Sequence, residues 1–233
     1  MFVVVDRWSQ SRGGHLRFSV IAPTSPRSEI ACKFVAEVFR EAYQATINPR
    51  PDAYVFCERN TENGDVPLAC AGLTFGFLRE RLFSEQYLDD TIQDVLGGAG
   101  KHRVERAEIV EIGSLASRHT AAAAGLICAL PIIAWFLGMR AILCTTTAVL
   151  RKLLDHHRIP FVALTEARSA RLPEDERKRW GSYYENSPLT GIILLQECGH
   201  LFSNHCGRFA FANLAGPDLG SVLQRTARQE NVA

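Results

Sequence analysis

The sequence predicts a mixed α/β protein with one central sheet flanked by helices. Residues 104–164 read as strand, glycine turn, apolar helix, strand, amphipathic helix and strand, which is the order of a parallel crossover. Earlier in the chain, strand-like runs at 53–58 and 68–77 enclose a turn sequence at 60–65, which predicts a hairpin. A sheet that begins with antiparallel strands and continues through a right-handed crossover satisfies both observations.

The N-terminal elements are a strand and a helix. Residues 15–22 alternate between apolar and polar side chains like a short strand. Pro26 then stands near the first turn of a helix, where a missing N–H does no harm. Apolar residues recur on one face of this helix to about Ala45, and the Asn-Pro-Arg-Pro sequence at 48–51 ends it. A further helix is expected over 85–96, closed by two glycines.

The crossover joins the fourth and fifth strands, which we expect at 107–115 and 141–146. Its helix, at 120–139, carries no charge and has the length of a membrane span. Pro131 in its middle and the strand pattern directly after it favour a helix buried under the sheet, so membrane association is the less favoured alternative. We expect the two strands to be parallel neighbours that splay apart at their C-terminal ends, because Gly113 lies near the end of the first.

The C-terminal part contains a charged helical stretch at 173–180 and a last strand at 191–196. Residues 197–233 are richer in glycine and end in polar residues, so we treat them as a C-terminal extension of a domain that covers 15–196. Asp155-His156-His157 closes a helix, and the spacing of Cys198, His200, His205 and Cys206 fits no common zinc finger; we therefore expect no metal site.

Net charge, cysteine number and the lack of certain motifs exclude several kinds of binding partner and cofactor. The formal net charge is +1, which gives no overall basic field for nucleic acid. Seven cysteines, an odd number without C-x-x-C spacing, predict reduced thiols and a cytoplasmic protein. The glycine motifs of dinucleotide-binding, P-loop and α/β-hydrolase proteins do not occur in the sequence.

Three sequence blocks carry a resemblance to a known family. They are L-F-S-E-Q-Y-L-D at 82–89, I-V-E-I-G-S-L-A at 109–116 and W-G-S-Y-Y at 180–184. In this order and spacing the chain resembles the thermostable hemolysin family over about 15–196. The element order is also similar to the GNAT acyltransferase fold, including its acyl-homoserine-lactone synthase branch. The family name records a lytic phenotype, and neither it nor the fold settles a mechanism.

The GNAT resemblance implies a binding site for a pantetheine thioester, either acyl-CoA or acyl carrier protein. The strand with Ile112, Gly113 and Leu115 would lie along the pantetheine arm. The next loop, with Arg118, Ala121 and Ala123, would hold the pyrophosphate, although alanines stand where the GNAT pattern has glycines. The alternative is that these alanines only begin a tightly packed helix. A carrier protein would instead dock on basic residues, the nearest in sequence being Lys101, Arg103, Arg106 and Arg140.

Amine acylation needs a base for the amine and an acid for the leaving thiolate. Glu111 lies between apolar residues of a strand, where burial would raise its pKa toward a useful range. The alternative for Glu111 is a structural salt bridge with Arg106 or Arg81. Tyr183 and Tyr184 fall where the fold commonly keeps its acid, or they are aromatic packing.

The block at 82–89 would lie on the acceptor side, with Glu85, Tyr87 and Asp89 as candidate substrate-binding residues. Glu85 and Asp89 share one face of the expected helix and would suit a cationic amine or a sulfonium. The alternative is that they only complement the dipole of the helix.

The sequence therefore predicts an acyltransferase that moves an acyl group from a pantetheine thioester directly to a small amine. Two alternatives stay open. One is a lactone-synthase relative that uses S-adenosylmethionine and an acyl carrier protein. The other is a membrane-active protein without enzymatic activity, for which residues 120–139 would have to be exposed or releasable.

Overall fold

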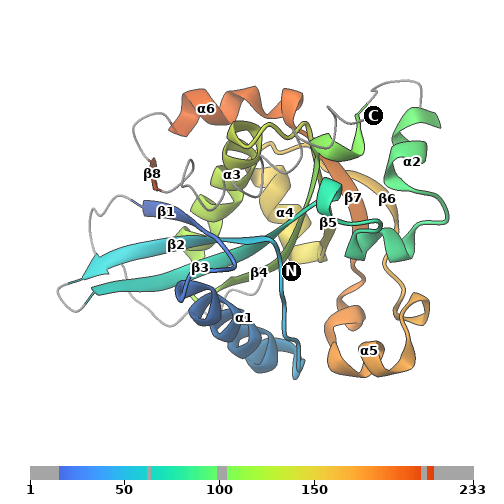
Figure 1. The fold of residues 1–233 in the computed structure, drawn as a ribbon, viewed down its shortest axis with the longest axis horizontal. Helices are drawn as coiled ribbons and strands as arrows, with labels where there is room; N and C mark the ends of the chain where they lie inside the picture. Colours follow the sequence, from blue (N-terminus) through green and yellow to red (C-terminus); the bar gives the residue numbers. More distant parts are fainter. Residues whose placement is uncertain (1–15, 62–63, 99–103, 206–208, 213–233) are drawn as a thin grey trace.

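A computed structural model describes residues 16–61, 64–98, 104–205 and 209–212. One eight-stranded mixed sheet of order β6-β7-β5-β4-β3-β2-β1-β8 forms its centre, with helices on both faces (Figure 1), so the predicted fold class is confirmed. The strands are β1 (Leu16–Ile21), β2 (Ala53–Thr61), β3 (Gly64–Phe75), β4 (Ile109–Ser117), β5 (Ala141–Thr146), β6 (Val162–Glu166), β7 (Leu189–Leu194) and β8 (Phe209–Ala212). The α-helices are α1 (Arg27–Tyr43), α2 (Ile92–Gly98), α3 (Thr120–Phe136), α4 (Ala148–His156), α5 (Glu174–Arg179) and α6 (Gly199–His205).

The two faces of the sheet are covered differently. Helix α1 packs Val38 and Phe39 against one face, while α3 packs Leu126 and Ile133 against the other, together with α4 and α6 (Figure 1). Helix α3 is apolar on all sides because the sheet and α6 enclose most of it. Within the described residues, no helix has both the length and the apolar character that a membrane span requires.

The expected parallel crossover connects β4 and β5. They pair in parallel only from Ile109 with Ala141 to Ile112 with Cys144. Beyond that point β4 continues to Ser117 and β5 pairs onward with β7 alone, so the strands splay as predicted.

A β-bulge in β4 lies at the start of the splay. Gly113 pairs with Gly72 and Ala116 with Cys70, so Ser114 and Leu115 together oppose the single residue between them on β3. Ser114 has a φ of 52°, a conformation that is unusual for a residue other than glycine. The bulge bends β4 where its pairing with β5 ends.

Two parts of the chain differ from the sequence-based expectation. The helix predicted over 85–96 is a 3₁₀ turn, η2 (Phe83–Tyr87), followed by the separate helix α2. The prediction was wrong because Leu88 leaves the turn in an extended conformation. Glu85 does not lie on a helix face but accepts the backbone N–H groups at the start of each element, those of Leu82 and Ile92.

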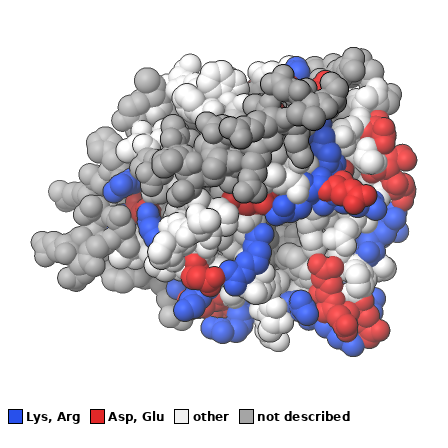
Figure 2. Space-filling model, in the orientation of Figure 1, with Lys and Arg blue, Asp and Glu red and all other residues white. Residues whose placement is uncertain are grey.

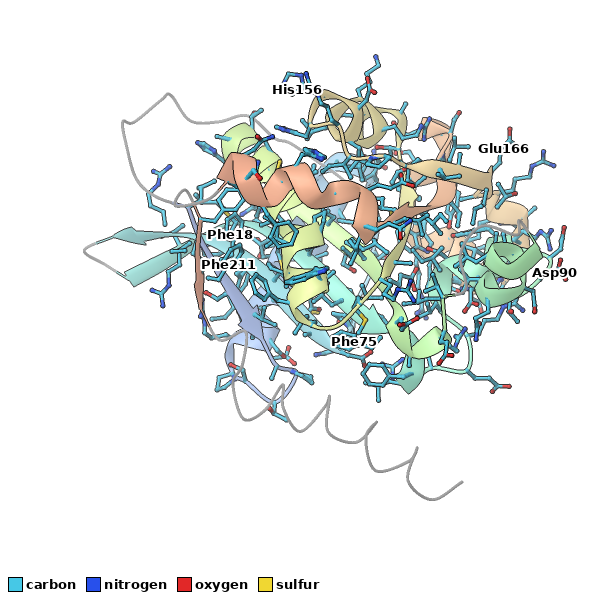
Figure 3. All side chains as sticks on the ribbon, turned by 90° about the horizontal axis from the view of Figure 1, so that it is seen from above. Phe18, Phe75, Asp90, His156, Glu166 and Phe211 are labelled. Carbon is cyan, nitrogen blue, oxygen red and sulfur yellow. The ribbon has the colours of Figure 1, made fainter. Side chains whose placement is uncertain are left out.

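The residues after 197 also contribute to the sheet. Strand β8 pairs in parallel with β1, beside which Phe18 meets Phe209 and Phe211 at centroid distances of 4.9 and 5.9 Å. Figure 3 shows the Phe18 and Phe211 rings side by side. Part of the stretch treated as an extension therefore completes the edge of the sheet.

Candidate active site

A cavity of about 350 Å³ opens where β4 and β5 separate. Strands β3 and β4 form its floor with Thr74, Glu111 and Ser114, and α5 and the loop after α1 form its walls with Trp180 and Arg50. Its lining includes carboxylates, guanidinium groups and aromatic rings, so the cavity suits a small polar ligand.

Two smaller cavities continue from this opening into the splay. One of about 40 Å³ shares Phe83, Glu111, Gly113 and Trp180 with the large cavity. The other, of about 30 Å³, is apolar and lies beneath α3 and α4; it shares Ile112 and Thr145 with the middle one. The three cavities therefore adjoin in the order large, middle and apolar.

Glu111 stands where the large and the middle cavity meet. The residue is only 5% exposed. One carboxylate oxygen accepts the N–H of Phe83 at 2.8 Å; the other accepts the N–H of Ser84 at 2.8 Å and the Ser84 hydroxyl at 2.5 Å. Burial raises the pKa of Glu111 above the usual glutamate range, and the three donors only partly oppose this shift. The group is therefore a stronger base than an exposed glutamate.

The arginines suggested as salt-bridge partners of Glu111 bind elsewhere. Both terminal nitrogens of Arg106 donate to the Glu85 carboxylate, at 3.0 and 2.9 Å, and Arg81 donates to the carbonyls of Glu85 and Leu88. Glu111 is thus held by hydrogen bonds and not by an ion pair within the described residues.

The candidate acceptor-side carboxylates are separated. Glu85 is buried and ion-paired with Arg106, whereas Asp89 is 83% exposed and paired with Arg171. Neither residue lines the three cavities, and the two do not share a helix face. The free carboxylate at the cavity wall is instead Glu176 of α5, which is half-buried and has no ion pair among the described residues.

Three tyrosines gather beside the middle cavity. Tyr87 and Tyr183 line it, and the Tyr87 hydroxyl lies 2.5 Å from that of Tyr184. Burial raises the pKa of all three, that of Tyr184 to about 12, so each is a neutral phenol at neutral pH. Gly181 makes this arrangement possible: its φ is +51°, and a Cβ there would lie 2.0 Å from the Tyr43 carbonyl.

The candidate pyrophosphate loop is occupied by internal contacts. The Arg118 guanidinium pairs with Glu37 at 3.2 Å and Glu41 at 2.8 Å, and lies over the Phe34 ring. His119 caps α3 by accepting the N–H of Ala122 at 3.3 Å. Ala121 is exposed, while Ala123 is fully buried in the packed start of the helix.

Arg118→Ala should change the dissociation constant of free coenzyme A less than about twofold, because the guanidinium is already neutralised by two carboxylates. Calorimetric titration of both proteins measures this. Binding that weakens about tenfold would show that a phosphate takes Arg118 away from α1.

The remaining candidates are placed as follows. Arg140 pairs with Glu108, while Lys101, Arg103 and Cys206 lie outside the described residues. Figure 2 shows acidic and basic residues interspersed around α2 and α5 on the visible face. The described part of the chain brings together no group of three or more residues able to hold a metal ion.

Sequence reasoning missed several cavity residues. Ser84, Thr145 and Trp180 contribute a hydroxyl or a ring to the site. Ser84 and Trp180 lie inside the sequence blocks at 82–89 and 180–184, and their place in those blocks could have identified them as site residues. Thr145 is one of three consecutive threonines, and only the end of strand pairing singles it out.

Comparisons with known proteins identify a family and a fold. A family profile described as thermostable hemolysin matches residues 21–198. The structure is similar to that of a CoA-dependent acyl-homoserine lactone synthase, BjaI, with SAM and isopentyl-CoA (TM-score 0.52, 11% identity, covering 84% of this chain and 93% of that one). It is also similar to the AHL synthase LasI (TM-score 0.50, 12% identity, 78% and 91% covered). No curated protein matches the sequence. At these identities the likeness shows the fold.

Proposed function

Since the chain belongs to the thermostable hemolysin family and has the fold of acyl-homoserine lactone synthases, we propose that it is an acyltransferase, which moves an acyl group from a pantetheine thioester to a small amine. The observation that carries this proposal is the buried Glu111, which lies where the large polar cavity meets the middle cavity, and the middle cavity in turn adjoins the apolar one. A base between an amine site and an acyl site is what the reaction needs.

The apolar cavity marks where the acyl group of the donor would lie, and at about 30 Å³ it takes a short one. Its wall is formed by Ile127 and Leu130 of α3 and Leu150 of α4, with Ile142 of β5. Past Ile112 the β4 backbone is not paired with β5, so its edge faces the splay and is available to the amides of pantetheine. Ile112, Gly113 and Leu115 are the residues of β4 that would lie along the donor. A thioester of either coenzyme A or a carrier protein fits this description.

The large cavity suits the amine. Glu176 and Trp180 are one helical turn apart and offer a carboxylate and a ring to a cation, while Arg179 offers a guanidinium group; that of Arg50 already pairs with Glu29 at 2.6 Å. S-adenosylmethionine, which carries a sulfonium, an ammonium and a carboxylate, matches this set of groups. The carboxylate beside the ring therefore favours a lactone-synthase-like reaction as the second candidate.

The transfer step follows from these positions. The amine nitrogen attacks the thioester carbonyl, and its proton passes to Glu111. A C–N bond forms and the C–S bond breaks, with the electron pair leaving on sulfur as a thiolate. Over the full turnover the proton lost by nitrogen ends on sulfur, so Glu111 returns to its charged form. Because burial raises the pKa of Glu111, the carboxylate accepts this proton more readily than an exposed one.

The transfer should proceed without an acyl-enzyme. Cys144 is the thiol that borders the apolar cavity, and burial raises its pKa to about 12. At neutral pH it is therefore almost entirely the thiol and not the thiolate, which is the nucleophilic form. Incubation with an acyl donor and no amine should leave the intact mass of the protein unchanged. A stoichiometric acyl adduct on Cys144 would contradict direct transfer.

The proposed function is tested by mass spectrometry of reaction mixtures. Acyl-CoA donors of increasing chain length and a matched acyl carrier protein are each incubated with S-adenosylmethionine or with simple amines. An acylated amine that forms at a rate proportional to enzyme concentration supports the proposal. If no donor and acceptor pair reacts while the protein lyses red cells, the membrane-active alternative is correct.

A further inference from the structure

A chain of hydroxyl groups runs from Glu111 across the splay. The Ser84 hydroxyl of η2 lies 2.5 Å from the Glu111 carboxylate and 2.9 Å from the Thr145 hydroxyl of β5. The Thr145 hydroxyl in turn lies 2.8 Å from that of Thr190 on β7. Ser84 and Thr190 are buried and Thr145 is half-buried, and Thr145 borders both the middle and the apolar cavity.

The charge of Glu111 determines which hydroxyl donates and which accepts in each hydrogen bond of this series. An ionised carboxylate only accepts hydrogen bonds, so the Ser84 hydroxyl donates to it. The Ser84 oxygen is then the acceptor for Thr145, and the Thr145 oxygen is the acceptor for Thr190. In this order the hydroxyl hydrogen of Thr145 points toward Ser84 and not toward the cavities.

We propose that this chain couples the charge of Glu111 to Thr145, which donates a hydrogen bond to the leaving sulfur once Glu111 has taken the proton of the amine. The inference rests on the proposed acyl transfer. A protonated carboxyl is a weaker acceptor than a carboxylate, so the Ser84 hydroxyl then turns to donate to Thr145. The Thr145 hydrogen is thereby released toward the splay, where the C–S bond breaks and the thiolate forms.

The rotation breaks no covalent bond, since each hydroxyl keeps its own hydrogen. Thr145 is the residue that touches the reacting sulfur, and Ser84 is a positioning residue that acts through it. A cross-strand contact between Thr145 and Thr190, which are paired residues of β5 and β7, would need no third member. The link from Ser84 to both Glu111 and Thr145 is what a purely structural pair does not explain.

The test compares two acyl donors that share one acyl group. One is an alkyl thioester of coenzyme A or pantetheine, whose thiolate needs stabilisation; the other is an aryl thioester of a thiophenol, whose thiolate leaves without help. Thr145→Val should lower kcat/KM about 10- to 100-fold for the alkyl thioester, the effect of a hydrogen bond to a charged group. For the aryl thioester the loss should stay below about threefold, and Thr145→Ser should restore the alkyl rate.

Ser84→Ala tests the coupling through a second residue. It removes the acceptor that holds the Thr145 hydrogen, so it should cost less on the alkyl thioester than Thr145→Val does. It should also move the acidic limb of the pH profile upward, because the Ser84 hydroxyl lowers the pKa of Glu111. Ser19→Ala is the matched control: Ser19 is equally buried and donates to a buried carboxylate, that of Glu58, at 2.8 Å outside the site.

If Thr145→Val lost equally on both donors, or lost on neither, or if Ser84→Ala left the acidic limb in place, the coupling would be overturned while acyl transfer stayed intact. If the wild-type protein transferred from neither donor, the proposed function itself would fail and the coupling with it.

Discussion

Glu111→Gln should reduce turnover per folded molecule by about 10²-fold or more, because an amide cannot take the proton of the attacking amine. In the wild-type protein kcat/KM should rise with pH through the pKa of Glu111. Since burial raises that pKa, the midpoint should lie above the usual range of glutamate. The glutamine variant should lose this acidic limb. Steady-state rates over a pH series, corrected for the folded fraction, measure both effects.

The same substitution should also lower stability. Glutamine places an NH₂ group against one of the backbone N–H donors of Phe83 and Ser84, which leaves that buried donor unsatisfied at a cost of about 1–3 kcal/mol. Glu58→Gln is the control for turnover, since Glu58 is also buried and hydrogen-bonded but pairs with Arg27 and lies away from the cavities. A Glu111→Gln protein with wild-type turnover per folded molecule would show that Glu111 has only a structural role.

Arg106→Ala should be the most destabilising single change near the site. It leaves the Glu85 carboxylate, 1% exposed, without its cation, and breaking such a buried pair costs about 3–5 kcal/mol. For a domain of this size the melting temperature should fall by about 10 °C. Thermal unfolding followed by circular dichroism measures it, with Arg171→Ala as control, because Arg171 pairs with the exposed Asp89.

The pH dependence of this variant checks the cause. Burial alone would raise the pKa of Glu85, but Arg106 and the N–H groups of Ile92 and Leu82 outweigh it, so the pKa lies below the usual value. A lowered pKa stabilises the fold above the ordinary glutamate pKa and loses that stabilisation as pH falls through the folded-state value. The difference between wild type and Arg106→Ala should therefore shrink in acid. A difference that is constant with pH would mean that Arg106 acts through packing alone.

The sequence predicted those elements of the fold in which apolar residues recur at a regular spacing. Hydrophobic periodicity gave the crossover of β4, α3 and β5, and the apolar neighbours of Glu111 correctly indicated its burial. The sequence did not reveal where Glu85 would find partners, since Arg106 is distant along the chain and only folding brings it close. The Ser84–Thr145 contact was missed for the same reason, because it joins residues 61 positions apart.

The C-terminal strand shows a second kind of failure. Strand β8 is short, and glycine surrounds it in the sequence, so its composition resembles that of a tail. Its position is set by an edge of β1 that needs backbone partners and by the ring of Phe18, which no local pattern reveals.

The splay has a thermodynamic consequence. Only four residue pairs, from Ile109 to Ile112, join β4 to β5. The sheet therefore consists of two halves, β6-β7-β5 and β4-β3-β2-β1-β8, held together by a short stretch of pairing. At such a short stretch of pairing the two halves can separate before the whole fold is lost. A thioester bound in the splay would contact both halves. The tighter it binds, the more free energy is needed to separate the two halves.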